Sequence, residues 1–478
     1  MRWITIWTLL LTTWTNGELR GQSVSISPEI LIKNDFSYFY FPHPDGNISL
    51  LRDKSFRLSL LTLYQDFNWS VEKNLNLRGK KWRIIDIYGK GNDIDVFYIT
   101  QEESQLKLIK SQFNQQGEVI QELILHASPY EEHYRNFQTQ LSQNKQWICF
   151  LFEDQRSEKT AMVLNRNEDS VYCFKKLSSW LQLKSEIPIK QFLITDDGTV
   201  FIHSLIEQQE GKKTKLRETI VKLQSNAVET LSQVLPIQDL NILQSQLQYD
   251  NINKKLLYAA LFSDKQERYP EGYLLLCYNH TFQMDWKKKT PFSSEMLRNW
   301  KGETSVKSIF RDGELKLRDI VMSQNGSSLL FFEYAREISR RPYFSSIDAS
   351  NNLTSRWFDY YFDDLLVAHF DHQGNSLWEH ILHKRQYSQD DDGIFSSFYI
   401  FKNPALLRIV FNDAVNSEGT VSEYLLKPNG DFIRKSVLNT TYKNLNLRFR
   451  DAMSIQSDEM LLPSESNGKL TLVKIQFN

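Results

Sequence analysis

The sequence predicts an all-β protein of the β-propeller class, with seven or eight four-stranded blades. Short apolar runs separated by turn residues fill the chain, which is typical of strands. Two kinds of hairpin recur in alternation, and together they form a four-stranded unit. The units repeat roughly every 40–50 residues, a period that indicates a propeller when each repeat holds four strands.

The first hairpin joins two apolar strands through a short polar turn that ends at or near Gly. The turn Asn114 to Gly117 is one example. Asn and Gly tolerate the positive φ that such turns need, so these segments predict hairpins. The same pattern covers residues 108–124, 365–382 and 424–438, with a degenerate copy at 274–290.

The second hairpin precedes the first and ends in a strongly apolar strand. It covers residues 141–150, 194–202 and 322–332. In the last copy Leu329, Leu330, Phe331 and Phe332 follow one another without a polar residue. A strand with one wet face would alternate, so this run predicts a strand covered on both faces.

The two patterns place seven complete units and an incomplete one. The C-terminal tail from 446 to 478 supplies only about three strands, and the segment from Val24 to Ile32 would supply the fourth. This exchange would pair the N- and C-terminal strands and leave no open sheet edge in the ring. The complete units lie near residues 36–79, 82–126, 137–183, 190–235, 246–290, 315–384 and 396–440.

The first residues predict a signal peptide. Arg2 is followed by a short apolar run to Leu11, which is too short for a membrane span of about 20 residues. Cleavage after Gly17 or Gly21 would leave one propeller domain, so we expect a leader at 1–21 and a domain at 22–478. A buried N-terminal strand is the alternative. No later run is long enough for a transmembrane segment, and the predicted location is secreted or periplasmic.

Composition argues against several classes of partner and cofactor. With 57 Lys and Arg against 58 Asp and Glu, the net charge is −1, which favours neither nucleic acid nor an anionic membrane surface. The three cysteines, Cys149, Cys173 and Cys277, sit in apolar runs without clustered partners. They predict small buried hydrophobes rather than disulfides or metal ligands. We also expect the protein to bind no cofactor and to be a monomer.

Two segments, 279–302 and 336–362, break the regular spacing. Long loops in a compact fold are often functional. The second segment is rich in aromatic and basic residues, which suit a sugar platform or a protein-docking patch. Burial of the same aromatics in an enlarged blade is the alternative. The candidate ligand-binding residues are Arg341, Tyr343, Arg356, Trp357, Tyr360 and Tyr361.

Carboxylates near predicted strand ends raise an enzymatic alternative. If the ring brought two of them together, they could act as acid and base on a glycosidic bond, although most such residues cap turns. The acidic loop Asp390 to Gly393 and the pair His380 and His383 lack the spacing of a calcium or zinc site. The carboxylates are Glu153, Asp154, Asp196, Asp197, Asp264, Asp319, Asp413 and Asp451.

One stretch resembles a known group of proteins. The hairpin from Leu365 through Asp371, Gly374 and Trp378 leads to Lys384 and Gln386, and then to the run 409–416 with its Asn-Asp-x-x-x-Asn. It is similar to uncharacterised secreted proteins of Bacteroidetes bacteria, over about 55 residues. The resemblance implies a location in the periplasm or outside the cell, and it implies no activity.

These observations favour a non-catalytic binding or scaffold propeller that recognises a protein or a glycan through its loops. The alternative is a polysaccharide hydrolase or lyase. Two carboxyl groups about 5–10 Å apart in an aromatic-lined pocket would favour the enzyme. A shallow surface with scattered charges would favour the scaffold.

Overall fold

A computed structural model gives the fold. It describes residues 22–55, 57–129, 134–154, 156–177, 189–210, 213–224, 230–237, 239–264, 268–340, 357–403, 406–413, 419–440 and 445–477. The predicted leader at 1–21 therefore lies outside the described residues. Within the described ranges no helix combines the length and apolar character needed to cross a membrane.

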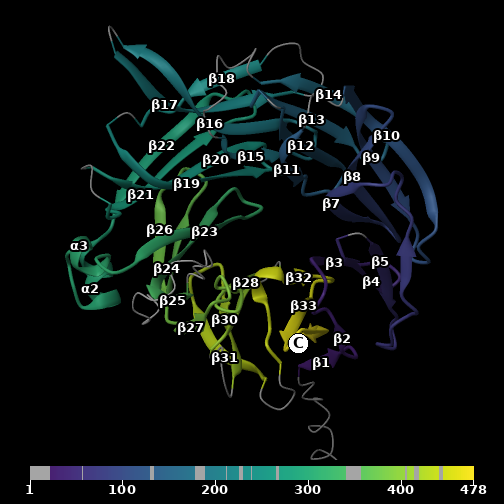
Figure 1. Cartoon of the computed structure of the whole chain (residues 1–478). Helices are drawn as coiled ribbons and strands as arrows, with labels where there is room; N and C mark the ends of the chain where they lie inside the picture. Colours follow the sequence, from purple (N-terminus) through teal and green to yellow (C-terminus); the bar gives the residue numbers. More distant parts are fainter. Residues whose placement is uncertain are drawn as a thin grey trace, which may run out of the picture. The chain divides into compact units, whose positions relative to one another are not determined.

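Eight antiparallel sheets with four main strands each make this chain an eight-bladed β-propeller. The first three sheets follow one another along the chain (Figure 1). Their strands are β3 (Ser37–Pro42), β4 (Ile48–Asp53), β5 (Leu58–Leu63) and β6 (Lys73–Leu75); β7 (Trp82–Lys90), β8 (Asp93–Glu102), β9 (Gln105–Phe113) and β10 (Val119–Pro129); and β11 (Arg135–Leu141), β12 (Trp147–Glu153), β13 (Lys159–Asn165) and β14 (Ser170–Lys176).

The next three sheets complete a compact unit that runs from β3 to β27. In Figure 1 its six sheets succeed one another in chain order. The strands are β15 (Ile189–Ile194), β16 (Val200–Glu210), β17 (Lys213–Leu223) and β18 (Thr230–Val234); β19 (Asn241–Asp250), β20 (Lys255–Ser263), β21 (Gly272–Tyr278) and β22 (Met284–Pro291); and β23 (Glu314–Met322), β24 (Ser328–Arg340), β25 (Trp357–Phe370) and β26 (Ser376–Leu382), with β27 (Gln386–Gln389) beside β25.

A second compact unit holds the last two sheets. The first strand β1 pairs with the last strand β34, with Val24 opposite Ile475, so the predicted N- and C-terminal pairing is confirmed. The short β2 pairs with the other end of β34. The strands are β28 (Phe398–Asn403), β29 (Leu406–Asn412), β30 (Thr420–Leu426) and β31 (Phe432–Asn439); and β32 (Met453–Ser454), β33 (Glu459–Ser466), β34 (Lys469–Gln476) and β1 (Ser23–Ile26), with β2 (Ile30–Leu31) and the 3-10 turn η3 (Phe449–Asp451).

Strand burial explains why the sheets stack. Leu330, Phe331 and Phe332 are each fully buried, as the unbroken apolar run predicts. Leu330 and Phe332 pack with residues of the fifth sheet, such as Tyr273, whose ring lies 5.1 Å from that of Phe332. Within each unit the cores lie between successive sheets, which cover each other's apolar faces.

In every sheet of the larger unit the first strand is the inner one. Neighbouring first strands adjoin each other along the series β3, β7, β11, β15, β19 and β23. The fourth strands lie at the opposite edge and expose apolar side chains, including Ile120 of β10 and Phe174 of β14. Because the first strands adjoin one another, a ligand that reaches them contacts residues from several sheets at once.

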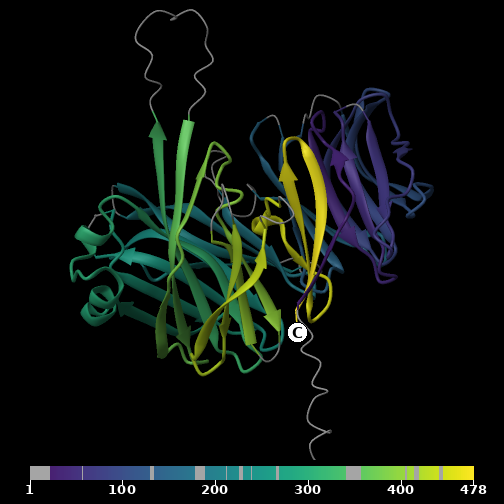
Figure 2. The ribbon, with the colours of Figure 1, turned by 90° about the horizontal axis from the view of Figure 1, so that it is seen from below.

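Both irregular segments have local structure. After β22 come two short helices, α2 (Ser294–Lys301) and α3 (Val306–Ile309). Ser293 caps α2 by accepting from the backbone of Met296, and Gly302 ends it with φ +71°. Strands β24 and β25 extend past the rest of their sheet, and Figure 2 shows them projecting as two long green strands. We call this projection the arm.

Candidate functional site

Four of the six candidate ligand-binding residues lie wholly or partly outside the described residues. Arg341, Tyr343 and Arg356 fall outside them entirely, and Trp357 is placed only as the first residue of β25. Tyr360 and Tyr361 are described, and both lie in the arm portion of β25, opposite Glu337 and Arg336 of β24. The predicted segment is thus a strand rather than a loop where it is described.

The arm places its aromatic side chains on two faces. Phe358, Tyr360 and Phe362 form a ladder on one face, with ring centroids 6.1 and 6.5 Å apart. Tyr360 is only 7% exposed and packs with Ala335. Its ring is therefore a packing element of the enlarged blade, not an open sugar platform.

Tyr361 points to the opposite face. Its ring lies 4.9 Å from that of Tyr387 in β27, and the guanidinium of Arg336 sits 4.6 Å from its centroid. Arg336 also pairs with Asp363 at 3.2 Å. These contacts hold the base of the arm against the sheet and bring an arginine to its surface.

A cavity of about 450 Å³ lies at this base, and we call it the arm-base cavity. Its size is within the range of about 300–1,000 Å³ usual for ligand pockets. It combines four cationic and three acidic side chains with three aromatic rings. The lining residues are Arg268, Tyr269, Phe310, Arg311, Asp312, Gly313, Glu314, Lys316, Ala335, Arg336, Glu337 and Phe358.

The charges of the arm-base cavity differ in how firmly they are held. Lys316 is paired with Glu337 at 2.7 Å. Arg268 instead stacks on its neighbour Tyr269, 5.1 Å from the ring centroid, and donates to its hydroxyl at 3.0 Å. Arg311 is 74% exposed and only loosely paired with Asp312 at 3.5 Å. Arg268 and Arg311 can therefore meet a ligand without breaking a strong ion pair.

Gly313 keeps the cavity wall close to the arm. A Cβ at this position would lie 2.6 Å from atoms of both Arg336 and Tyr334. The backbone there can approach the arm only because glycine has no side chain. Sequence reasoning missed Arg268, Tyr269 and Arg311, because they follow different strands and only the fold brings them to the arm.

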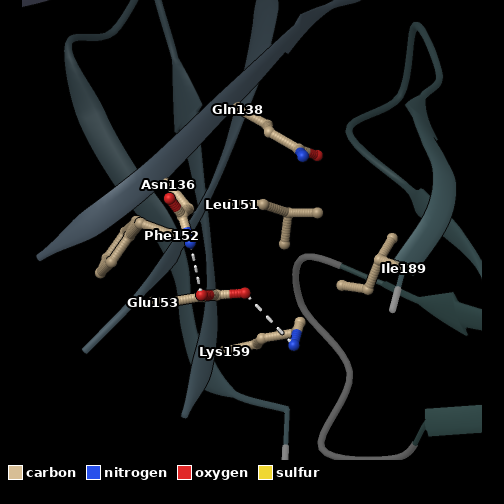
Figure 3. Close-up of a pocket in the computed structure, with 7 residues that line it drawn as sticks. All are labelled: Asn136, Gln138, Leu151, Phe152, Glu153, Lys159 and Ile189. Atoms are coloured by element: carbon tan, nitrogen blue, oxygen red, sulfur yellow. Dashed lines mark hydrogen bonds and ion pairs between the residues drawn. The ribbon is translucent and has the colours of Figure 1, made fainter. Parts of the chain in front are cut away.

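A second cavity lies between the third and fourth sheets. It measures about 210 Å³ and is lined by Asn136, Gln138, Leu151, Phe152, Glu153, Lys159 and Ile189. We call it the inter-sheet cavity. Figure 3 shows Glu153 held between Asn136 and Lys159, at 2.8 and 3.3 Å. The amide of Gln138 and the side chains of Leu151 and Ile189 border the remaining space.

A third cavity, of about 410 Å³, separates α2 from β26. Both His380 and His383 line it, together with Glu295 and Glu379. Burial raises the pKa of Glu379. His383 contacts Asp364 at 3.0 Å; burial of Asp364 opposes its ionisation, but hydrogen bonds from Lys301 and His383 outweigh that effect and lower its pKa. Among the described residues no group of three or more His, Cys, Asp or Glu could hold a metal ion.

The eight carboxylates singled out from the sequence are all engaged, four of them by backbone N–H groups. Asp154 accepts from Arg156 and Glu158, and Asp197 accepts from Thr199 at 3.1 Å. Asp196 accepts from the N–H of Asn144 at 2.8 Å, which ties two sheets together. Asp319 accepts from Ile320 at 2.7 Å. These four carboxylates stabilise turns and strand irregularities.

The other four face cations. Glu153 pairs with Lys159, Asp264 with Lys289 at 2.5 Å, Asp413 with Arg434, and Asp451 with Arg448 at 2.5 Å. In the acidic loop, Asp391 accepts from the N–H of Gly393 at 3.0 Å. None of the eight thus stands as an unengaged acid or base.

Comparisons with known proteins find structural likenesses at low sequence identity. No family model matches the sequence, and no curated protein matches it either, so the resemblance to secreted Bacteroidetes proteins stays a prediction. Among solved structures, the chain is similar to one described as the Dos1 propeller, at 8% identity over 94% of both chains with a TM-score of 0.44.

Two further similar structures come from proteins of different kinds. One is a eukaryotic initiation factor, at 10% identity over 92% of this chain and 84% of that chain, with a TM-score of 0.43. Another is a polysaccharide lyase, an ulvan lyase, at 9% identity over 81% and 90%, with a TM-score of 0.38. Likeness at this level does not transfer an activity.

Proposed function

We propose that this protein is a non-catalytic binding propeller that recognises a protein or a glycan at the arm-base cavity. The observation that carries the proposal is the cavity itself. It offers Tyr269 and the weakly held Arg268 and Arg311 beside a projecting arm. Tyrosine and arginine are, with tryptophan, enriched at the energetic centre of interfaces.

The state of the carboxylates also supports binding over hydrolysis. A glycosidase needs one carboxyl that donates a proton and a second that acts as nucleophile or base. The eight carboxylates considered above are committed to turns or to cations. Hydrogen bonds and cations that contact a carboxylate favour its ionised form, so a carboxyl held in this way is a poor proton donor.

The experiment compares the mature protein with the double variant R268A/Y269A on a glycan array and in pull-downs from a periplasmic or secreted fraction. Arg268 is exposed and Tyr269 is half-buried at the edge of the core, so the variant should fold. R298A, which removes an exposed arginine of α2 outside the cavity, is the matched control. We expect at least one ligand that binds wild type and R298A and loses about tenfold or more affinity for the double variant.

Ligands that bind all three proteins equally would overturn the arm-base assignment. Product formation from a bound glycan would overturn the non-catalytic part of the proposal. In that case the second candidate function, a polysaccharide hydrolase or lyase, is supported by Glu379. Its raised pKa suits a proton donor, and it shares a cavity with Glu295. The variant E379Q should then abolish product formation while leaving binding intact.

We also propose that the protein is exported and acts as a monomer. The basic and apolar start of the sequence supports export. N-terminal sequencing of the protein from a periplasmic fraction should begin near Glu18 or Gln22, and a full-length N-terminus in the cytoplasm would contradict export. Light scattering on the purified protein should give the mass of one chain, and a larger mass would contradict the monomer.

A further inference from the structure

Five of the six inner strands of the larger unit share an irregularity that β3 lacks. In each of β7, β11, β15, β19 and β23 the pairing register shifts once, near the start of the strand or at its middle. The first paired residue after the shift is always an acid or an amide. These residues are Asp86, Gln138, Gln191, Gln244 and Asp319.

Both aspartates accept from the backbone of their own strands, and Asp86 also accepts from the hydroxyl of Thr139 in β11. Asp86 accepts from the N–H of Ile87 at 2.8 Å, and Asp319 accepts from the N–H of Ile320 at 2.7 Å. The longer glutamines can reach across to the next sheet. A glutamine at this place can therefore link neighbouring inner strands.

Two of the three glutamines each form two hydrogen bonds with the backbone of one residue in the neighbouring strand. Gln191 donates to the carbonyl of Leu247 at 3.0 Å and accepts from the N–H of the same residue at 2.6 Å. Gln244 donates to the carbonyl of Leu317 at 3.1 Å and accepts from the N–H of Leu317 at 2.8 Å. In both cases the carboxamide pairs with the N–H and C=O of a single leucine in extended backbone, as a neighbouring strand would.

The third glutamine has no such residue. Within the described part of the chain, the Gln138 side chain is exposed and makes no hydrogen bond. It borders the inter-sheet cavity, where the side chains of Leu151 and Ile189 face the same space (Figure 3). In this cavity the carboxamide of Gln138 can still donate one hydrogen bond and accept another, and it lies beside the apolar side chains of Leu151 and Ile189.

We propose that Gln138 and the inter-sheet cavity bind one residue of an extended peptide from a partner protein. The carboxamide of Gln138 pairs with the N–H and C=O of that residue, and an aliphatic side chain covers Leu151 and Ile189. The template is internal to the chain, because Gln191 and Gln244 already bind leucine in this way.

The geometry selects a peptide over a sugar. In an extended residue the N–H and C=O lie on the same side and match a carboxamide. In an acetamido group of an amino sugar the two point in opposite directions, because the amide is trans. The volume of about 210 Å³ is below that of usual ligand pockets, so it suits a single residue of a longer chain.

The test uses N-acetyl-L-leucine N′-methylamide, the smallest molecule that presents a leucine with both backbone groups. The protein is labelled with ¹⁵N, and the side-chain amide signals of Gln138 are assigned by their loss in Q138A. We expect these signals to move saturably on titration. Q138A should bind the probe about tenfold or more weakly, since two hydrogen bonds are lost.

Two controls separate this site from non-specific binding. Gln105 is also exposed at the start of β9, and Q105A should bind the probe as wild type does. The ester analogue replaces the leucine N–H by oxygen. Wild type should bind this ester more weakly than the amide probe, whereas Q138A should bind the two molecules equally. Such a difference identifies the two-point contact itself.

Unmoved Gln138 signals, or equal binding by Q138A, would overturn the proposal. So would a crystal structure in which Gln138 binds the backbone of Ile189, since the cavity would then close on its own inner strand. The site is separate from the arm-base cavity, so these outcomes leave the proposed function untouched. Conversely, R268A/Y269A should bind the leucine probe normally.

Discussion

At the scale of single residues, Gly198 shows how one turn fixes the approach of two sheets. It lies in the turn between β15 and β16 with φ +82°, and a Cβ there would sit 2.9 Å from the indole of Trp147 in the neighbouring sheet. Trp147 is buried, so the ring has little room to move. We expect G198A to destabilise the protein by about 2 kcal/mol or more, from backbone strain and overpacking together.

Gly91 separates these two effects. It also has positive φ, at +60°, but a Cβ at this position would meet no other atom within 4 Å. G91A should therefore cost only about 1 kcal/mol, the backbone part alone. Urea unfolding midpoints measure both variants. Equal losses would mean that the contact with Trp147 does not restrict Gly198.

Glu218 is a largely buried carboxylate whose charge is stabilised by its neighbours. Its Oε2 accepts from His203 at 2.8 Å and from the hydroxyl of Tyr258 at 3.0 Å, and Lys190 pairs with its other oxygen. Burial alone would raise the pKa of Glu218, but hydrogen bonds from His203 and Lys190 outweigh it and lower the pKa to about 2.

The lowered pKa predicts a loss of stability in acid. A carboxyl with a depressed folded-state pKa stabilises the fold above its unfolded pKa, and this contribution disappears as pH falls toward the folded value. For Glu218 the window runs from its ordinary value of 4.5 down to about 2. The shift corresponds to roughly 3 kcal/mol.

The variant E218Q isolates this contribution. Its free energy of unfolding should change less between pH 6 and pH 2 than that of wild type, by about 3 kcal/mol, because it has no proton to take up. Chemical unfolding at a series of pH values measures the difference. Parallel curves for the two proteins would show that Glu218 titrates normally in the folded state.

At the scale of elements, the hairpins could be predicted because their signals are local. The turn Asn114 to Gly117 joins β9 to β10 as expected, and the apolar run at Leu329 lies in the buried strand β24. The short helix α2 could not be predicted, because its eight residues hold too little periodicity.

The faces of the arm also lay beyond local signals. In a strand, alternate residues face opposite sides, so the roles of Tyr360 and Tyr361 depend on a register that the sequence does not state. That register puts Tyr360 into a packed ladder and Tyr361 against Arg336. The arm-base cavity needs residues from several strands, which only the tertiary structure assembles.

Strand β1 completes the last sheet, and its removal should expose an edge. Val24 and Ile26 pack against the core formed by β33 and β34. The double variant V24D/I26D puts two charges at this interface. We expect the amides of β34 to exchange with deuterium at least tenfold faster in this variant, because β1 no longer protects them.

The control for this prediction is S23A, at the exposed end of the same strand. It removes only the hydrogen bond from Ser23 to the side chain of Gln476. Its exchange pattern should match that of wild type. Unchanged protection of β34 in V24D/I26D would mean that β1 contributes nothing to the closure of this sheet.

At the scale of the larger unit, successive sheets are tied by polar contacts as well as by apolar packing. Asn144 of the third sheet contacts Asp196 of the fourth, whose N–H in turn donates to Asn251 of the fifth at 3.0 Å. Gln191 and Gln244 add further links between the inner strands. The repeat period predicts neighbouring sheets, whereas these specific contacts depend on turn geometry.

These links predict that the third and fifth sheets open together. Cys149 in β12 and Cys277 in β21 are both buried, and burial raises the pKa of both thiols, that of Cys277 to about 11. Neither thiol can react until its sheet opens, because the thiolate is the reactive form. In native-state labelling at increasing urea, the two residues should show the same opening free energy and the same urea dependence.

Cys173 on the outer strand β14 is the control, because it reports local fraying of the third sheet and should label at lower urea. If Cys277 instead opened at lower urea than Cys149, the fifth sheet would be an independent unit and the contacts through Asp196 would not couple it to the third.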